Sequence, residues 1–188
     1  MLDFLVKDPE TGWLVTCPST TPELSFITDK DERCSVSKGT TVDNPMIRSL
    51  VRNCIKACKE LSTDDAFRKQ MEEAINQLPP YQIGKFGQLQ EWFYDFKENE
   101  VTHRHLSHLF GVYPDDDITL RKNPELIKAV NVVLKRRGDI NTGWSGAWKI
   151  NLHARLEEAE PEYTIHNRMI TETSLHPRPE NTDVTQSC

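Results

Sequence analysis

Residues 44–61, NPMIRSLVRNCIKACKEL, carry the clearest structural signal in this chain of 188 residues. Asn44 suits the N-cap of a helix and Pro45 its first turn, where proline has no backbone hydrogen bond to lose. Apolar side chains then recur every three or four residues, the spacing of one helix face. This face consists of Met46, Ile47, Leu50, Val51, Cys54, Ile55, Cys58 and Leu61. The stretch therefore predicts an amphipathic helix over residues 45–61.

The same period recurs on the C-terminal side of this helix. It predicts further helices over residues 64–78, 88–96, 102–114, 123–138 and 142–156. Residues 1–7 are expected to end a helix, and residues 13–17 to form a short extended segment. Because apolar and polar residues alternate nowhere else, we expect no sheet. The predicted fold class is all-α, with long loops between the helices.

The amino-acid composition of the chain changes near residue 160. Residues 161–188 are polar and end in HPRPENTDVTQSC, which has the composition of unfolded chain. We therefore expect one ordered domain over residues 1–160, followed by a disordered tail that matches no known domain.

Composition excludes several classes of protein. Hydrophobic residues make up 37% and charged residues 28% of the chain, as in soluble globular proteins. The net charge is -6, and no basic stripe indicates a nucleic-acid surface. The longest basic run, Lys135 to Arg137, falls at the end of a predicted helix, where the helix dipole favours it. No apolar run is long enough to cross a membrane, and no signal peptide is evident.

The cysteines and histidines do not form a convincing metal or disulfide pattern. Five cysteines at irregular spacing argue against a disulfide framework. Cys54 and Cys58 are one helical turn apart on an apolar face, so we interpret them as core residues. His105 and His108 would share a helix face, but no HExxH motif accompanies them. We predict no metal and no cofactor.

The stretch CPSTTPEL, residues 17–24, places one carboxylate in a stiff loop. Pro18 and Pro22 restrict the backbone, and the hydroxyl groups between them can satisfy its polar atoms. A carboxylic acid that donates a proton must be aimed in this way, so Glu23 is a candidate general acid. The residues alone also allow a Pro-Glu helix start, in which Glu23 only complements the dipole.

A second candidate group lies at residues 103–105, His-Arg-His. Arg104 offers a planar set of donors, and His105 a ring that donates or accepts, which suits a polyhydroxylated or anionic ligand. Capping and packing of a polar helix explain the same residues equally well. Glu91 is a possible second carboxylate, and Trp144 is one of several aromatic residues that could stack on a sugar face.

Five motifs taken together resemble glycoside hydrolase family 95, the inverting α-L-fucosidases. In order, they are GWLVTCPSTTPE (12–23), TTVDNPMIRSLV (40–51), LPPYQIGKFGQLQEWFYDF (78–96), HRHLSHLFGVYP (103–114) and TGWSGAWKINLHARL (142–156). The resemblance implies an (α/α)6 barrel, of which this chain would supply about half of the helical ring.

The resemblance also implies a chemistry and a substrate. Glu23 matches the family's general acid, and Arg104 and His105 match its fucose-binding pair. Four further residues are expected to support the site by lying around these three: Thr20, Glu91, His103 and Trp144. The expected substrate is an oligosaccharide or glycan with a terminal α-L-fucosyl group, in α-1,2 linkage, and family members are often secreted.

The chain also departs from the family pattern. It contains neither the two upstream asparagines nor the Asp-Gly-Asn-Phe-Gly motif that position the attacking water. We therefore expect an interior fragment of the catalytic domain that is inactive by itself. Two alternatives stay open: a helical module that binds carbohydrate without cleaving it, and a truncated gene product without function.

Overall fold

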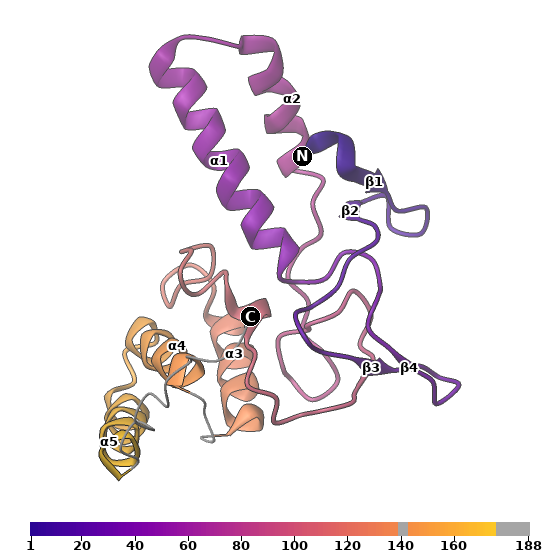
Figure 1. Cartoon of the computed structure of the whole chain (residues 1–188). Helices are drawn as coiled ribbons and strands as arrows, with labels where there is room; N and C mark the ends of the chain where they lie inside the picture. Colours follow the sequence, from indigo (N-terminus) through magenta and orange to yellow (C-terminus); the bar gives the residue numbers. More distant parts are fainter. Residues whose placement is uncertain (139–142, 176–188) are drawn as a thin grey trace, which may run out of the picture. The chain divides into compact units, whose positions relative to one another are not determined.

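The computed structural model describes residues 1–138 and 143–175 (Figure 1). The chain divides into two compact units, Met1–Ile140 and Asn141–Cys188. In the described residues the α-helices are α1 (Asp43–Leu61), α2 (Asp65–Ile75), α3 (Pro124–Arg137), α4 (Gly143–Arg155) and α5 (Ala159–Leu175). The described chain is therefore rich in helix, as the sequence predicts.

The N-terminal segment differs from its prediction. A short 3-10 helix, η1 (Leu2–Phe4), leads into strand β1 (Leu5–Lys7), which pairs antiparallel with β2 (Leu14–Thr16). The extended segment expected at residues 13–17 is thus confirmed by β2, but residues 5–7 are strand rather than helix. Asp8 closes the turn between the strands, because its carboxylate accepts hydrogen bonds from the backbone and hydroxyl of Thr11.

A second small sheet contains β3 (Phe26–Ile27), β4 (Arg33–Cys34) and β5 (Lys97–Glu98), in the order β4-β3-β5. Both neighbours pair antiparallel with β3. The expectation of no sheet was therefore wrong. Strands of two or three residues are too short to show alternation, and β5 reaches β3 from about 70 residues away, which no local pattern reveals.

Helices α1 and α2 form an antiparallel hairpin, and Figure 1 shows the two helices side by side. Ile47 and Val51 of α1 pack with Met71 of α2 and with Leu78 in a buried cluster. Cys54 and Cys58 are partly buried against this cluster, as expected of core residues. However, Met46, Leu50 and Leu61 are exposed, so the apolar face of α1 is wider than α2 covers.

The stretches 88–96 and 102–114 are not helices, contrary to prediction. Residues 88–96 form an irregular segment whose backbone bonds to distant residues: Leu89 N–H donates to the carbonyl of Ala129. Its aromatic side chains surround Phe26, with ring centroids at 4.7 Å for Trp92 and 4.0 Å for Phe96. Residues 102–114 contain one short 3-10 helix, η2 (Ser107–Leu109). Tertiary contacts have overridden local preference in both stretches.

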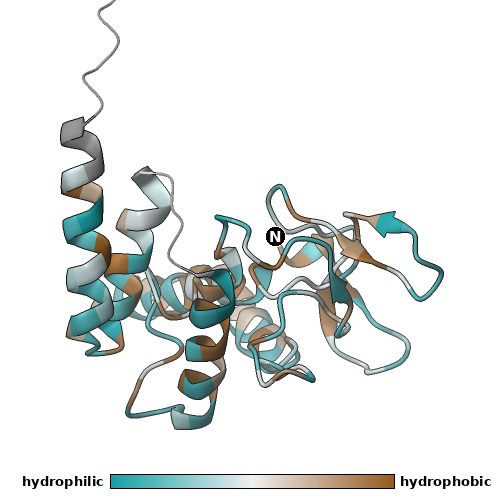
Figure 2. Cartoon of the chain, turned by 90° about the horizontal axis from the view of Figure 1, so that it is seen from below, coloured by the Kyte–Doolittle hydropathy of each residue, from teal (hydrophilic) through white to brown (hydrophobic). Residues whose placement is uncertain are grey.

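Helix α3 follows its prediction closely. Pro124 begins it, and the chain leaves it at Gly138, whose φ of 65° suits a residue without Cβ. Ile127, Val130 and Val133 are buried along one face. Figure 2, coloured by hydropathy, shows both hydrophilic and hydrophobic patches along the helices. In the described part of the chain, no helix has both the length and the apolar character needed to cross a membrane.

The second unit contains α4 and α5, which pack against each other. Helix α4 agrees with the helix predicted over residues 142–156, although residue 142 lies outside the described residues. Helix α5 occupies residues that we expected to be disordered, so that prediction was wrong for residues 161–175. Ile165 is buried, so this polar helix packs through at least one apolar position. Residues 176–188 of the predicted tail lie outside the described residues.

Neighbouring residues of α1 provide a test of the buried cluster. Ile47 is 3% exposed, whereas Met46 is 45% exposed. Replacing Ile47 by alanine should lower the free energy of unfolding by about 2–5 kcal/mol, because it removes buried methyl groups and leaves a cavity. Met46→Ala should change it by less than about 1 kcal/mol. Urea unfolding of both variants measures the difference, and equal losses would contradict this description of the core.

Candidate active site

The loop that carries Glu23 is fixed on both sides. Ser19 exchanges backbone hydrogen bonds of 2.8 Å with Ser37, and its hydroxyl donates to Asp43 Oδ2 at 2.7 Å. Thr21 and Leu24 are buried, and the backbone N–H of Leu24 donates to the carbonyl of Thr21 at 3.3 Å. Glu23 is the exposed tip of this tight turn, with a left-handed φ of 56°. No helix begins here, so the reading of Glu23 as a helix start was wrong.

Glu23 meets the Arg-His pair that lies 81 residues further along the chain. Arg104 Nη2 donates to Glu23 Oε2, and His105 Nε2 lies 3.3 Å from the same oxygen. The side chains of Glu23 and Arg104 are 58% and 40% exposed, so solvent and ligands can reach both. The structure therefore brings together the three residues that the sequence singled out.

His103 contacts this pair through a hydrogen bond with the backbone of His105. It is buried, and its Nδ1 accepts a hydrogen bond of 3.2 Å from the backbone N–H of His105. Burial lowers the pKa of His103 below its ordinary value; Glu100 opposes this effect, and the neighbouring His105, Arg104 and Arg137 add to it. A neutral ring is what the contact requires, because only an unprotonated Nδ1 can accept.

Glu91 lies beneath the site and is buried. Thr21 Oγ1 donates to its Oε1 at 2.9 Å, and Arg137 Nη2 donates to its Oε2 at 2.6 Å. His108 Nδ1 lies 3.2 Å from Oε1. Burial by itself would raise the pKa of the Glu91 carboxyl, but His108, Arg137 and Thr21 outweigh burial and lower the pKa to about 2. Glu91 is therefore a buried anion.

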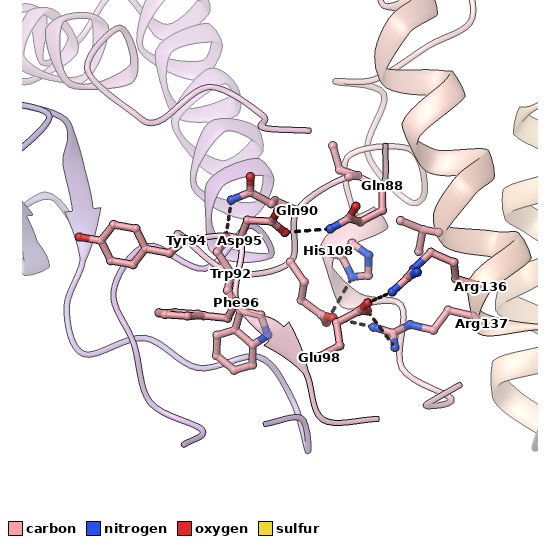
Figure 3. A pocket seen from close by; sticks show the side chains of 13 residues that line it. Gln88, Gln90, Trp92, Tyr94, Asp95, Phe96, Glu98, His108, Arg136 and Arg137 are labelled. Atoms are coloured by element: carbon pink, nitrogen blue, oxygen red, sulfur yellow. Dashed lines mark hydrogen bonds and ion pairs between the residues drawn. The ribbon is translucent and has the colours of Figure 1, made fainter. Parts of the chain in front are cut away.

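Arg137 extends this network toward the Arg-His pair. Its Nη1 donates to the backbone carbonyls of Glu100 and Val101, at 3.0 and 2.8 Å. Figure 3 shows Arg136 and Arg137 reaching from α3 toward Glu98, beside His108. These groups line one small cavity with Gln88, Gln90 and Trp92.

The other predicted residues are placed as follows. Thr20 braces the loop, since its hydroxyl donates to the carbonyl of Ser35 at 2.7 Å. Trp144 is an exposed residue of α4, in the second unit, so its part in the site stays a prediction. His105 faces Glu23 whereas His108 faces Glu91, so the two do not form a pair. Within residues 1–138 and 143–175, no cluster of His, Cys, Asp and Glu could hold a metal ion.

Sequence reasoning missed Thr21, His108 and Arg137 as members of the site. The basic run at residues 135–137 was explained by the helix dipole, yet Arg137 is 3% exposed and bound to Glu91. The sequence held one indication of the inward orientation of Arg137. An arginine that follows the last buried position of an apolar helix face can point its side chain into the protein.

The sequence model of the glycosyl hydrolase family 95 catalytic domain matches residues 1–186. The chain belongs to glycosyl hydrolase family 95. The match includes most of residues 161–188, for which we expected no homology. Residues 17–24, which carry Glu23 and are called the acid loop below for their proposed role, and the Arg-His pair thus lie within a glycosidase catalytic domain.

Curated relatives carry fucosidase names. The chain is 42% identical over 172 residues to Alpha-L-fucosidase 2 of Arabidopsis thaliana. This alignment covers 91% of this chain and 20% of the relative. It is 32% identical over 174 residues to Probable alpha-fucosidase A of Aspergillus niger (87% and 21%), and 31% identical over 163 residues to the protein of that name from Aspergillus oryzae (80% and 21%). The chain thus spans about one fifth of the length of these relatives.

The buried anion predicts acid sensitivity. Glu91→Gln should destabilise the chain at pH 7 by about 3–5 kcal/mol, because Arg137 is then buried without its anionic partner. The folded pKa of Glu91 lies below its ordinary value of 4.5. Its stabilising contribution is therefore complete above about pH 4.5 and is lost as the pH falls toward 2. The difference in free energy of unfolding between wild type and Glu91→Gln, measured with urea, should therefore become smaller between pH 4.5 and pH 2. A difference that does not change with pH would show that Glu91 is not ionised.

Proposed function

We propose that this chain forms part of an α-L-fucosidase catalytic domain, which hydrolyses terminal α-L-fucosyl linkages in oligosaccharides. The observation that carries the proposal is the meeting of Glu23 with Arg104 and His105 at one carboxylate oxygen. A carboxylic acid for the leaving group and donors for a sugar ring are what glycoside hydrolysis requires on one side of the bond. Membership of family 95 and the names of the relatives support fucose as the sugar.

Glu23 would act as the general acid. It lies at the tip of a turn that is anchored through Ser19 and Thr21, so its carboxyl group is exposed but held in place. A proton donor must sit within hydrogen-bond distance of the glycosidic oxygen, and a fixed turn keeps the donor there at little entropic cost. Glu23 would protonate this oxygen as the bond to the sugar breaks.

Arg104 and His105 would bind the hydroxyl groups of fucose. Arg104 has five N–H donors in one plane, and His105 can donate or accept through Nε2. In the free protein both contact Glu23 Oε2. Sugar hydroxyls that bind Arg104 would draw it away from this oxygen, which leaves Glu23 free to take up a proton from solvent and donate it to the glycosidic oxygen. Substrate binding would thereby prepare the acid.

We further propose an inverting mechanism with an α-1,2 linkage as the natural substrate. Inversion needs a base on the opposite face of the sugar, about 6.5–9.5 Å from the acid, with a water between them. Glu91 does not suit this role, because its two oxygens are already bound to Thr21 and Arg137 and it is buried. The base would come from parts of the catalytic domain that this chain does not span.

The complete domain would be an (α/α)6 barrel. The α1–α2 hairpin has the form of one helix pair of such a barrel, and this chain would supply about half of the ring. The exposed Met46, Leu50 and Leu61 would be covered by neighbouring helices of the complete domain.

The 188-residue chain should not hydrolyse fucosides at an enzymatic rate by itself. Without a positioned base the rate should fall by on the order of 10²–10⁴, and loss of the remaining pocket adds to this. Fucose release from a fucosylated oligosaccharide by the purified chain measures it. Release that Glu23→Gln abolishes would contradict the assignment of the base to other parts of the domain.

The role of Glu23 can be tested in a chimera. The part of this chain that aligns with Alpha-L-fucosidase 2 from Arabidopsis thaliana, 91% of the chain, would replace the corresponding segment of that protein. Glu23→Gln should then slow fucosides with poor leaving groups by about 10²–10⁴, and activated aryl fucosides much less, because these need little protonation. Glu32→Gln, an exposed carboxylate in the β3–β4 turn, is the matched control and should retain activity. Equal losses for both substrate classes would assign Glu23 a binding or structural role.

A further inference from the structure

The buried Glu91 carboxylate connects the two loops of the site. Through Oε1 it accepts the Thr21 hydroxyl, two residues before Glu23. Through Oε2 it accepts Arg137, which also donates to the carbonyls of Glu100 and Val101, a few residues before Arg104. A continuous chain of hydrogen bonds therefore runs from the acid loop to the loop of the Arg-His pair, and its centre is one carboxylate.

We infer that Glu91 is a positioning residue, whose carboxylate sets the place of Glu23 relative to Arg104 and His105. The inference rests on the proposed function of these three residues. Glu91 is inaccessible to a substrate, so it would act through Thr21 on one side and Arg137 on the other.

Neither loop is held by regular secondary structure, and the contacts of Ser19 and Thr20 anchor the part of the acid loop that precedes Thr21. Residues 17–24 contain no helix or strand, and residues 101–106 contain none either. The geometry of such segments depends on their tertiary contacts, and a displacement of about 1 Å in a catalytic group can cost on the order of 10² in rate. A charged acceptor suits the task, because hydrogen bonds to a carboxylate are shorter and roughly twice as strong as neutral ones.

Thr21 is the contact through which the inference can be tested. Its side chain is buried, at 1% exposure, and its hydroxyl is used for Glu91. Thr21→Val keeps the shape and removes the donor, whereas Thr21→Ser keeps the donor. Thr11 offers a control outside this network: its hydroxyl also donates to a carboxylate, Asp8 Oδ2, at 2.7 Å, but in the exposed turn between β1 and β2.

The kinetic test uses the Arabidopsis chimera. Thr21→Val should lower kcat by about 10–100-fold for fucosides with poor leaving groups and by less than about 3-fold for activated aryl fucosides, because a misplaced acid matters only where protonation is needed. Thr21→Ser should restore activity to within about 3-fold of wild type. Thr11→Val should show no such difference between the substrate classes. An equal loss for both classes in Thr21→Val, or the same split in Thr11→Val, would overturn the inference.

A second measurement separates this inference from the proposed function. Hydrogen exchange of the Leu24 amide, which donates within the Glu23 turn, reports on the loop in the 188-residue chain without any need for activity. Thr21→Val should speed this exchange by about 10-fold over Thr11→Val. If the wild-type chimera were inactive, the proposed function would fail while faster exchange still supported the positioning role. Unchanged exchange would overturn the positioning role whatever the activity.

Discussion

A carboxylate that is removed from water needs partners from the protein for each of its oxygens, and Glu91 is such a carboxylate. Its partners come from three separate parts of the chain: the acid loop through Thr21, the η2 segment through His108 and the end of α3 through Arg137. The hydrogen bonds from Thr21 and Arg137 and the nearby His108 together offset the cost of burying this charge. The interaction therefore favours one arrangement of these segments over others that would leave the charge without partners.

The same constraint explains how exposed reactive groups are held by irregular backbone. Glu23 projects into solvent next to the exposed Pro22, but Thr21 and Leu24, which flank these two residues, are buried. Arg104 is partly exposed and follows the buried His103. In each loop, buried residues thus anchor the backbone beside the exposed side chain. This anchoring offsets part of the entropy that is lost when the loop is ordered.

Under the proposed function, this family 95 chain would contribute the side of the site that carries the acid and the sugar-binding pair. It spans about one fifth of the length of its curated relatives. The geometry supports a division of labour within the proposed catalytic domain, in which the acid loop and the Arg-His pair are built on one local network. The groups that activate water would be built elsewhere, on the opposite face of the sugar.

The sequence by itself determined the long helices and the identity of the three contacting residues. Helices α1, α2, α3 and α4 have apolar residues at helical spacing, and Pro124 and Gly138 mark the ends of α3, so local physics is sufficient. Glu23, Arg104 and His105 followed from chemical type and from the family motifs. Only the tertiary structure decided that Trp92 and Phe96 leave a helical pattern to surround Phe26, that short strands form, and that Arg137 turns inward to Glu91. The physical reason is that these choices depend on partners distant in sequence, whose packing and hydrogen bonds outweigh a weak local preference.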